Sequence, residues 1–202
     1  MNVAIEKPEI LSLLYTQEKA DPDYGSCLWA RFYLDLNNYT MAIESDCGNY
    51  TYGWVRTPKS ESFLQLLARM DPDYLLDKIS RQTVIDGDAT AAEFKEFIQE
   101  CAEGECIELS ESEWERIHDA CYHHDTVRDV VEAVLDEITS TELRKALEYD
   151  SYYLWSNVVM DYPAGAKKIA EVFGNCIKPK IKEIISGKLT MLSIIGSEEK
   201  EE

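Results

Sequence analysis

Long apolar runs, positive charge and catalytic motifs are all scarce in this chain of 202 residues. No stretch approaches about 18 consecutive apolar residues, so the sequence predicts no membrane-spanning helix. Its first residues mix acidic and basic side chains with Pro8, whereas a signal peptide has a basic stretch followed by an apolar one. We therefore expect no signal peptide and a cytoplasmic location.

Basic side chains are half as frequent as acidic ones. The chain has 20 Lys and Arg residues against 39 Asp and Glu residues, which gives a formal net charge of -19. Residues 86–150 hold 20 acidic and 5 basic side chains, whereas residues 151–202 hold 7 of each. Such a charge opposes direct binding to nucleic acid or to an anionic membrane and favours a basic partner.

Recognisable catalytic motifs are absent from the sequence. It contains no phosphate-binding loop G-x-x-x-x-G-K-[ST], no G-x-G-x-x-G fingerprint, no H-E-x-x-H and no G-x-S-x-G nucleophile elbow. The sequence therefore predicts a protein that is not an enzyme and needs no cofactor.

One group of cysteine and histidine residues offers an alternative as a zinc site. Its members lie close together in the sequence: Cys101, Cys106, His118 and Cys121. Thiolates and imidazoles are suitable zinc ligands, but the spacing C-x4-C followed by H-x2-C lacks the short pairs typical of closed zinc sites. A hydrolase that uses zinc or a Cys/His pair from this group is the corresponding alternative activity.

The N-terminal part reads as strands and the rest as helices. Three segments between Cys27 and Val55 are separated by turn signals, which predicts a three-stranded antiparallel meander. Ser60 is the predicted N-cap of the first helix, and Ser110 with Glu113 has the spacing of a capping box. The expected fold class is α+β, with the meander packed against helices and followed by a helical majority. The expected domains are residues 1–85, the meander with short helices, and residues 86–202, an acidic helical region packed on it in one compact unit.

Two sets of carboxylates occur at helical spacings of three or four, so each set shares one helix face. They are Glu96, Glu100 and Glu103, and Glu111, Glu115 and Asp119. Like charges at these spacings destabilise a helix by on the order of 0.2–0.5 kcal/mol per pair. We interpret the two faces as a surface that imitates a phosphate backbone and binds a basic protein. The alternative is a solvated face that only maintains solubility.

Two segments resemble a module of small phage and prophage proteins. Residues 43–54, IESDCGNYTYGW, and residues 73–79, DYLLDKI, fit the pattern S-D-x-G-x-Y-x-Y-x-W followed by D-Y-L-x-x-K. The resemblance covers about residues 28–80 well and the C-terminal part loosely, and it leaves the acidic segment outside.

Some phage proteins of this size and acidity look similar to anti-CRISPR proteins, and this chain resembles that group. The resemblance implies a protein that inhibits a CRISPR RNA-guided nuclease in the cytoplasm of an infected bacterial host. It assigns no individual site residue. A phage accessory protein without a defence role remains the alternative.

Overall fold

The computed structural model describes residues 8–55 and 61–187. The chain forms two units, which we call the sheet unit, residues 1–81 with 163–202, and the helical unit, residues 82–162. The helical unit is thus inserted into the sequence of the sheet unit. Within the described ranges, no helix is both long and apolar enough to cross a membrane.

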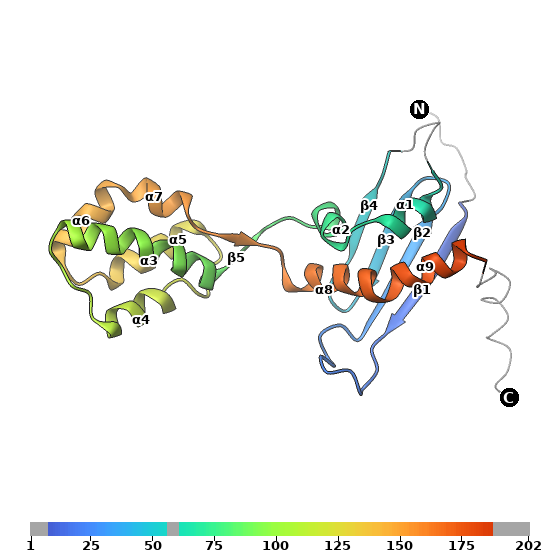
Figure 1. Cartoon of the computed structure of the whole chain (residues 1–202), viewed down its shortest axis with the longest axis horizontal. Coiled ribbons are helices and arrows are strands. Elements are labelled where there is room, and N and C mark those ends of the chain that lie inside the picture. Colours follow the sequence, from blue (N-terminus) through green and yellow to red (C-terminus); the bar gives the residue numbers. More distant parts are fainter. Residues whose placement is uncertain (1–7, 56–60, 188–202) are drawn as a thin grey trace, which may run out of the picture. The chain divides into compact units, whose positions relative to one another are not determined.

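The sheet unit contains four antiparallel strands in the order β1-β2-β3-β4 (Figure 1). Their bounds are Ile10–Thr16 for β1, Trp29–Asp35 for β2, Thr40–Ser45 for β3 and Tyr50–Gly53 for β4. The prediction of three strands was therefore wrong by one, because β1 was missed. Ile10 and Leu14 lie on the outer face of the sheet at 54% and 55% exposure, so apolar residues occur on both faces of β1 and hide the two-residue period that marks a strand.

Helices cover one face of this sheet (Figure 1). They are α1 Phe63–Arg69, α2 Pro72–Ile79, α8 Ala164–Val172 and α9 Lys178–Ile185, the last two joined by the π-helix η1 Phe173–Ile177. The rings of Phe32 on β2 and Phe173 on η1 lie 6.4 Å apart in a core that excludes water. Burial of these aromatic and aliphatic side chains holds the helices that precede residue 82 and those that follow residue 162 against the sheet.

The helical unit has a separate core. Its elements are β5 Val84–Ile85, α3 Gly87–Gly104, α4 Glu111–Asp119, α5 Val127–Glu137, α6 Thr141–Tyr149, α7 Ser151–Ser156 and β6 Met160–Asp161. Strands β5 and β6 pair with each other, so the unit begins and ends on one short antiparallel ribbon. Phe94 on α3, Ile117 on α4 and Val130 on α5 are buried together with residues of α6 and α7.

The structure confirms the α+β class. Its units, residues 1–81 with 163–202 and residues 82–162, have other boundaries than the predicted division into residues 1–85 and 86–202. Helices α8 and α9 pack on the sheet, since Ile169 and Ile181 belong to its core. The capping box of α4 forms as the spacing predicted. The N-cap of α1 is Ser62, which closes a capping box with Gln65, whereas the predicted cap Ser60 lies outside the described residues.

Candidate functional site

Most of the negative charge belongs to the helical unit. Residues 82–162 contain 21 acidic and 5 basic side chains, which is a formal net charge of -16 out of the chain's -19. The remaining charge of the sheet unit is therefore small for its size. The charge asymmetry seen along the sequence coincides with one folded unit and its own core.

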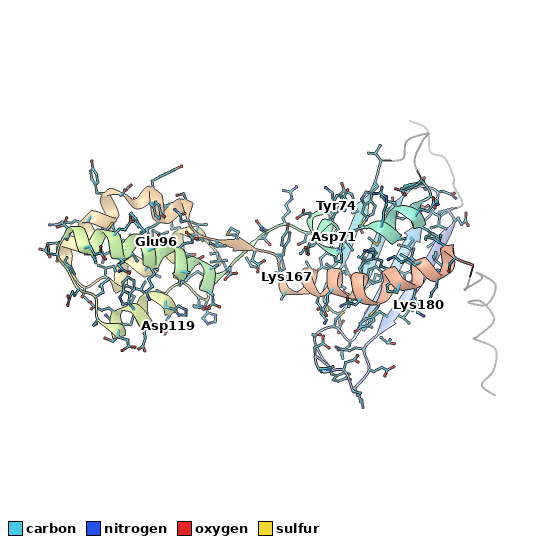
Figure 2. The ribbon with its side chains drawn as sticks, in the orientation of Figure 1. Asp71, Tyr74, Glu96, Asp119, Lys167 and Lys180 are labelled. Atoms are coloured by element: carbon cyan, nitrogen blue, oxygen red, sulfur yellow. The ribbon has the colours of Figure 1, made fainter. Side chains whose placement is uncertain are left out.

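All six predicted contact residues are exposed, but they do not form one surface. Glu111, Glu115 and Asp119 lie on α4, and the other three lie on α3. At about 100° per residue, Glu96, Glu100 and Glu103 lie roughly 80–140° around α3 from Lys95, which faces α4. Figure 2 shows Glu96 and Asp119 well apart. The spacing in the sequence correctly predicted which carboxylates share a helix face. The separation between the two sets depends on how α4 packs on α3.

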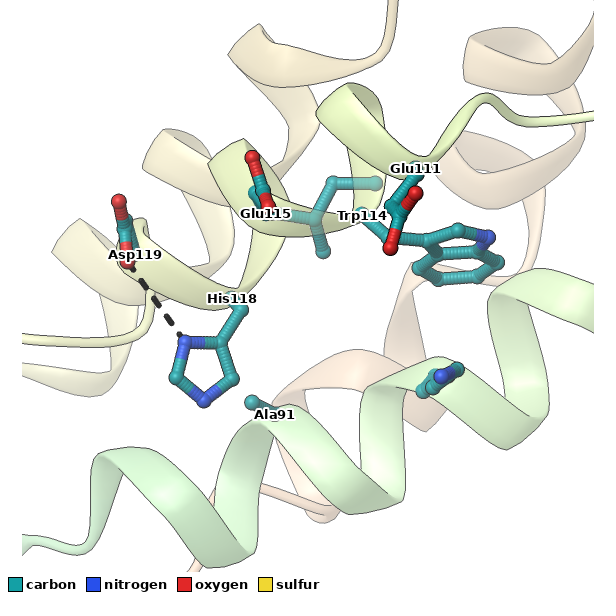
Figure 3. A pocket seen from close by; sticks show the side chains of 8 residues that line it. Ala91, Glu111, Trp114, Glu115, His118 and Asp119 are labelled. Atoms are coloured by element: carbon teal, nitrogen blue, oxygen red, sulfur yellow. Dashed lines mark ion pairs between the residues drawn. The ribbon is translucent and has the colours of Figure 1, made fainter.

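An open pocket of about 430 Å³ lies between α3 and α4 (Figure 3). Its lining includes Ala91 and Ile117, the indole of Trp114, and three carboxylates of the α4 set: Glu111, Glu115 and Asp119. The ammonium nitrogen Nζ of Lys95 lies 5.5 Å from the centroid of the Trp114 ring. A cation over an aromatic face is attracted by the ring quadrupole, so the pocket already holds a positive charge of its own chain.

His118 lies at one end of this pocket. Its Nδ1 is 3.6 Å from Oδ1 of Asp119, and its Nε2 is 3.5 Å from Oδ1 of Asp88 (Figure 3 draws the first contact). Tyr122 donates its hydroxyl hydrogen to Asp88, and this hydrogen bond to a carboxylate raises the pKa of Tyr122 to about 12. Both His118 nitrogens therefore face carboxylates. The Asp88 carboxylate is already engaged by the Tyr122 hydroxyl, and this hydrogen bond links α3 to the segment after α4.

The residues of the alternative zinc site do not come together. Cys121 is buried, its thiol donates to the carbonyl oxygen of Ile117 at 3.4 Å, and burial raises its pKa to about 11. Cys106 is exposed in the turn after α3. Neither of them, nor Cys101 or His118, belongs to a group of three close potential ligands within residues 8–55 and 61–187. The pattern C-x4-C…H-x2-C thus reflects separate positions, with Cys101 and His118 on helices and Cys106 and Cys121 just after the ends of α3 and α4.

A different trio does have its ligand atoms within 4.8 Å of one another: Cys27, Asp46 and Cys47 in the sheet unit. The Asp46 carboxylate accepts hydrogen bonds from the backbone N–H groups of Leu28 and Trp29 at 2.9 and 3.3 Å. Burial, the largest cause, strongly raises the pKa of the Cys27 thiol, which disfavours the thiolate that a metal needs. We interpret the trio as the structural junction between the start of β2 and the turn after β3.

A group of exposed aromatic side chains on α6 and α7 was not predicted from the sequence. They are Tyr149, Tyr152, Tyr153 and Trp155, at 95%, 81%, 36% and 41% exposure. The sequence signal was the repeat of aromatic residues at intervals of three from Tyr149 to Trp155. Aromatic residues at helical spacing are usually core, so only the structure identifies these as surface residues.

Comparison with known proteins gives a family. The model of a phage family, Phage_phiTE_072, matches residues 3–183. The matched range runs through the acidic segment, which lay outside the resemblance seen in the sequence. No curated protein and no solved structure matches the chain significantly.

Proposed function

This chain belongs to the phage family Phage_phiTE_072, and we propose that it acts as a non-enzymatic binding protein whose helical unit engages a basic surface of a host protein. The observation that carries the proposal is the concentration of a net charge of -16 in that unit. A dense field of one sign steers an oppositely charged partner and accelerates association.

The few basic residues of the helical unit leave this field largely uncompensated. Its three arginines pair internally: Arg116 with Glu137 at 2.9 Å, Arg144 with Asp136 at 2.9 Å, and Arg128 with Glu132 at 3.9 Å. Exposed pairs of this kind contribute little to stability. The unpaired excess of carboxylates costs stability through self-repulsion, and a binding role explains why the sequence retains it.

We propose a CRISPR RNA-guided nuclease as the target. Such an enzyme holds nucleic acid in a positively charged channel and contacts the backbone rather than the bases. A surface dense in carboxylates offers that channel a similar charge pattern. The resemblance of residues 28–80 to small phage proteins, some of which look like anti-CRISPR proteins, supports this choice of partner.

The deciding experiment is a pull-down with the tagged full chain from bacteria that express a CRISPR nuclease, followed by binding measurements with the purified partner. We expect the nuclease to be recovered and its affinity to fall steeply between about 50 and 200 mM salt. Affinity that does not change with salt would contradict the electrostatic mechanism. Recovery of a different basic protein instead would overturn the CRISPR target and favour an accessory role without a defence function.

Matched charge reversals locate the contact within the helical unit. The first variant combines Glu111→Lys with Glu115→Lys, and the second combines Glu96→Lys with Glu100→Lys. Both variants change the net charge equally, so a larger loss of affinity in one of them identifies which carboxylate set, that of α4 or that of α3, meets the partner. The control reverses two exposed carboxylates of the sheet unit, Glu9 and Glu18. A control that weakens binding as much as either variant would rule out the helical unit as the contact.

A further inference from the structure

The exposed aromatic side chains of α6 and α7 form a group that folding alone does not explain. Tyr149 ends α6, and Tyr152, Tyr153 and Trp155 belong to α7; we call these four the aromatic patch. Two of them keep more than four-fifths of their surface exposed. Clustered exposed aromatic residues are typical of binding sites, because Tyr and Trp combine a large contact area with little loss of conformational entropy.

The aromatic patch borders the acidic side of α3. The rings of Tyr153 and Phe97 stack with centroids 4.2 Å apart and an interplanar angle of 25°. On α3, Glu93 and Glu100 precede and follow Phe97 by four and three residues, so both lie next to it on the same helix face. Both glutamates are exposed. Carboxylates therefore adjoin the patch on the α3 side.

A further carboxylate lies within the patch itself. Asp150 is exposed and separates the aromatic residue that ends α6 from those of α7. It is close enough to Cys101 of α3 to add to the rise in the pKa of that thiol, of which burial is the larger cause. Exposed aromatic residues and carboxylates thus occur together on α3, on α6 and α7, and between these last two helices.

This combination of groups matches one side chain better than any other. The planar guanidinium of arginine stacks on aromatic rings and donates two parallel hydrogen bonds to a carboxylate, whereas the lysine ammonium does neither as well. We propose that the aromatic patch, with Glu93, Glu100 and Asp150, anchors arginine side chains of the basic partner. The inference rests on the proposed function and adds which surface and which partner residue make the contact.

Charge decides against two other arrangements. A second copy of this chain would bring another net charge of -19, of which -16 belongs to its helical unit, and the repulsion disfavours such a contact. The pocket between α3 and α4 also has an aromatic face and carboxylates, but Lys95 already lies over Trp114 there. The aromatic patch is therefore the better arginine site of the helical unit.

Fluorescence anisotropy of the full chain with two labelled peptides of equal length tests the inference: an arginine–glycine repeat and a lysine–glycine repeat. We expect the arginine peptide to bind more tightly. Exposed cation–π contacts contribute modestly, so the double variant Tyr152→Ala with Trp155→Ala should lower affinity for the arginine peptide by about five- to thirtyfold. It should lower affinity for the lysine peptide less.

Two further variants test whether the aromatic faces, and these residues in particular, bind the arginine peptide. Tyr152→Leu with Trp155→Leu keeps apolar area and removes the aromatic faces, so it should lose affinity as the alanine variant does; full retention would overturn the arginine assignment. Tyr24→Ala removes an exposed tyrosine of the sheet unit and should change nothing. Equal, salt-dependent binding of both peptides, unaffected by the patch variants, would overturn the anchor and leave the proposed function standing. Peptide binding that does not weaken with salt would contradict the proposed function itself.

Discussion

Replacing Gly165 by alanine should destabilise the sheet unit by about 1–3 kcal/mol, the usual range for overpacking a well-packed site. Gly165 is the second residue of α8 and lies against the turn between β3 and β4. A Cβ atom there would lie 2.2 Å from the backbone oxygen of Cys47 and 3.3 Å from the Tyr50 hydroxyl. Tyr50 donates that hydroxyl to the same oxygen at 2.9 Å, so both neighbours are held in place.

The direction of this effect is diagnostic, because helix propensity alone predicts the opposite. Alanine in a helix interior is favoured over glycine by about 1 kcal/mol. The clash is between Cβ and backbone, which no side-chain rotation relieves, so α8 or the turn must move by roughly 1 Å to reach ordinary contact. Gly104→Ala is the matched control: Gly104 ends α3, and a Cβ there meets nothing within 4 Å. We expect this control to be neutral or slightly stabilising.

Hydrogen exchange followed by mass spectrometry is the suitable assay, because the two units have separate cores and their unfolding need not be a single transition. Gly165→Ala should lower the free energy of opening for β2 and β3. Unchanged or increased protection of these strands in Gly165→Ala would refute the packing of α8 against the turn.

Three more predictions concern other contacts. Hydrogen bonds to the Glu113 carboxylate from Thr139, the largest cause, and from Ser110 at the cap of α4 lower its pKa from 4.5 to about 2. The resulting stabilisation is complete above about pH 4.5 and is lost as the pH falls toward about 2. Urea titrations should therefore show that Glu113→Gln weakens the helical unit near neutral pH but not at the acid limit. Replacing residues 84–160 by a short glycine–serine linker should leave the sheet unit folded, since the flanking backbone is joined by a hydrogen bond of 2.9 Å; a melt without cooperativity would count against this. Lys168, only 13% exposed, pairs with Asp23 in the loop after β1, so Lys168→Met should speed proteolytic cleavage of that loop; an unchanged rate would show that the pair does not hold it.

Local sequence patterns predicted local structure well. The Ser110 and Glu113 spacing predicted the start of α4, because a capping box involves only residues three apart. The exposure of Glu96 and Glu115 also followed from their spacing relative to apolar neighbours. Strand β1 was missed because its outer face carries apolar residues, and nothing in seven residues distinguishes a half-buried edge strand from other apolar segments.

Two features of the candidate site required the tertiary structure. The sequence by itself determined the amount and sign of the charge and the carboxylates that share a helix face, since these depend on composition and on the helical period. Only packing decided that the acidic segment is an inserted unit whose flanking helices complete the sheet unit. Packing also decided that the carboxylate set of α3 lies on a different side of this helix from the one that faces α4. Packing likewise decided that Tyr152 is exposed while Leu154, two residues later on the same helix, is buried. Burial depends on which side of α7 the neighbouring helices cover.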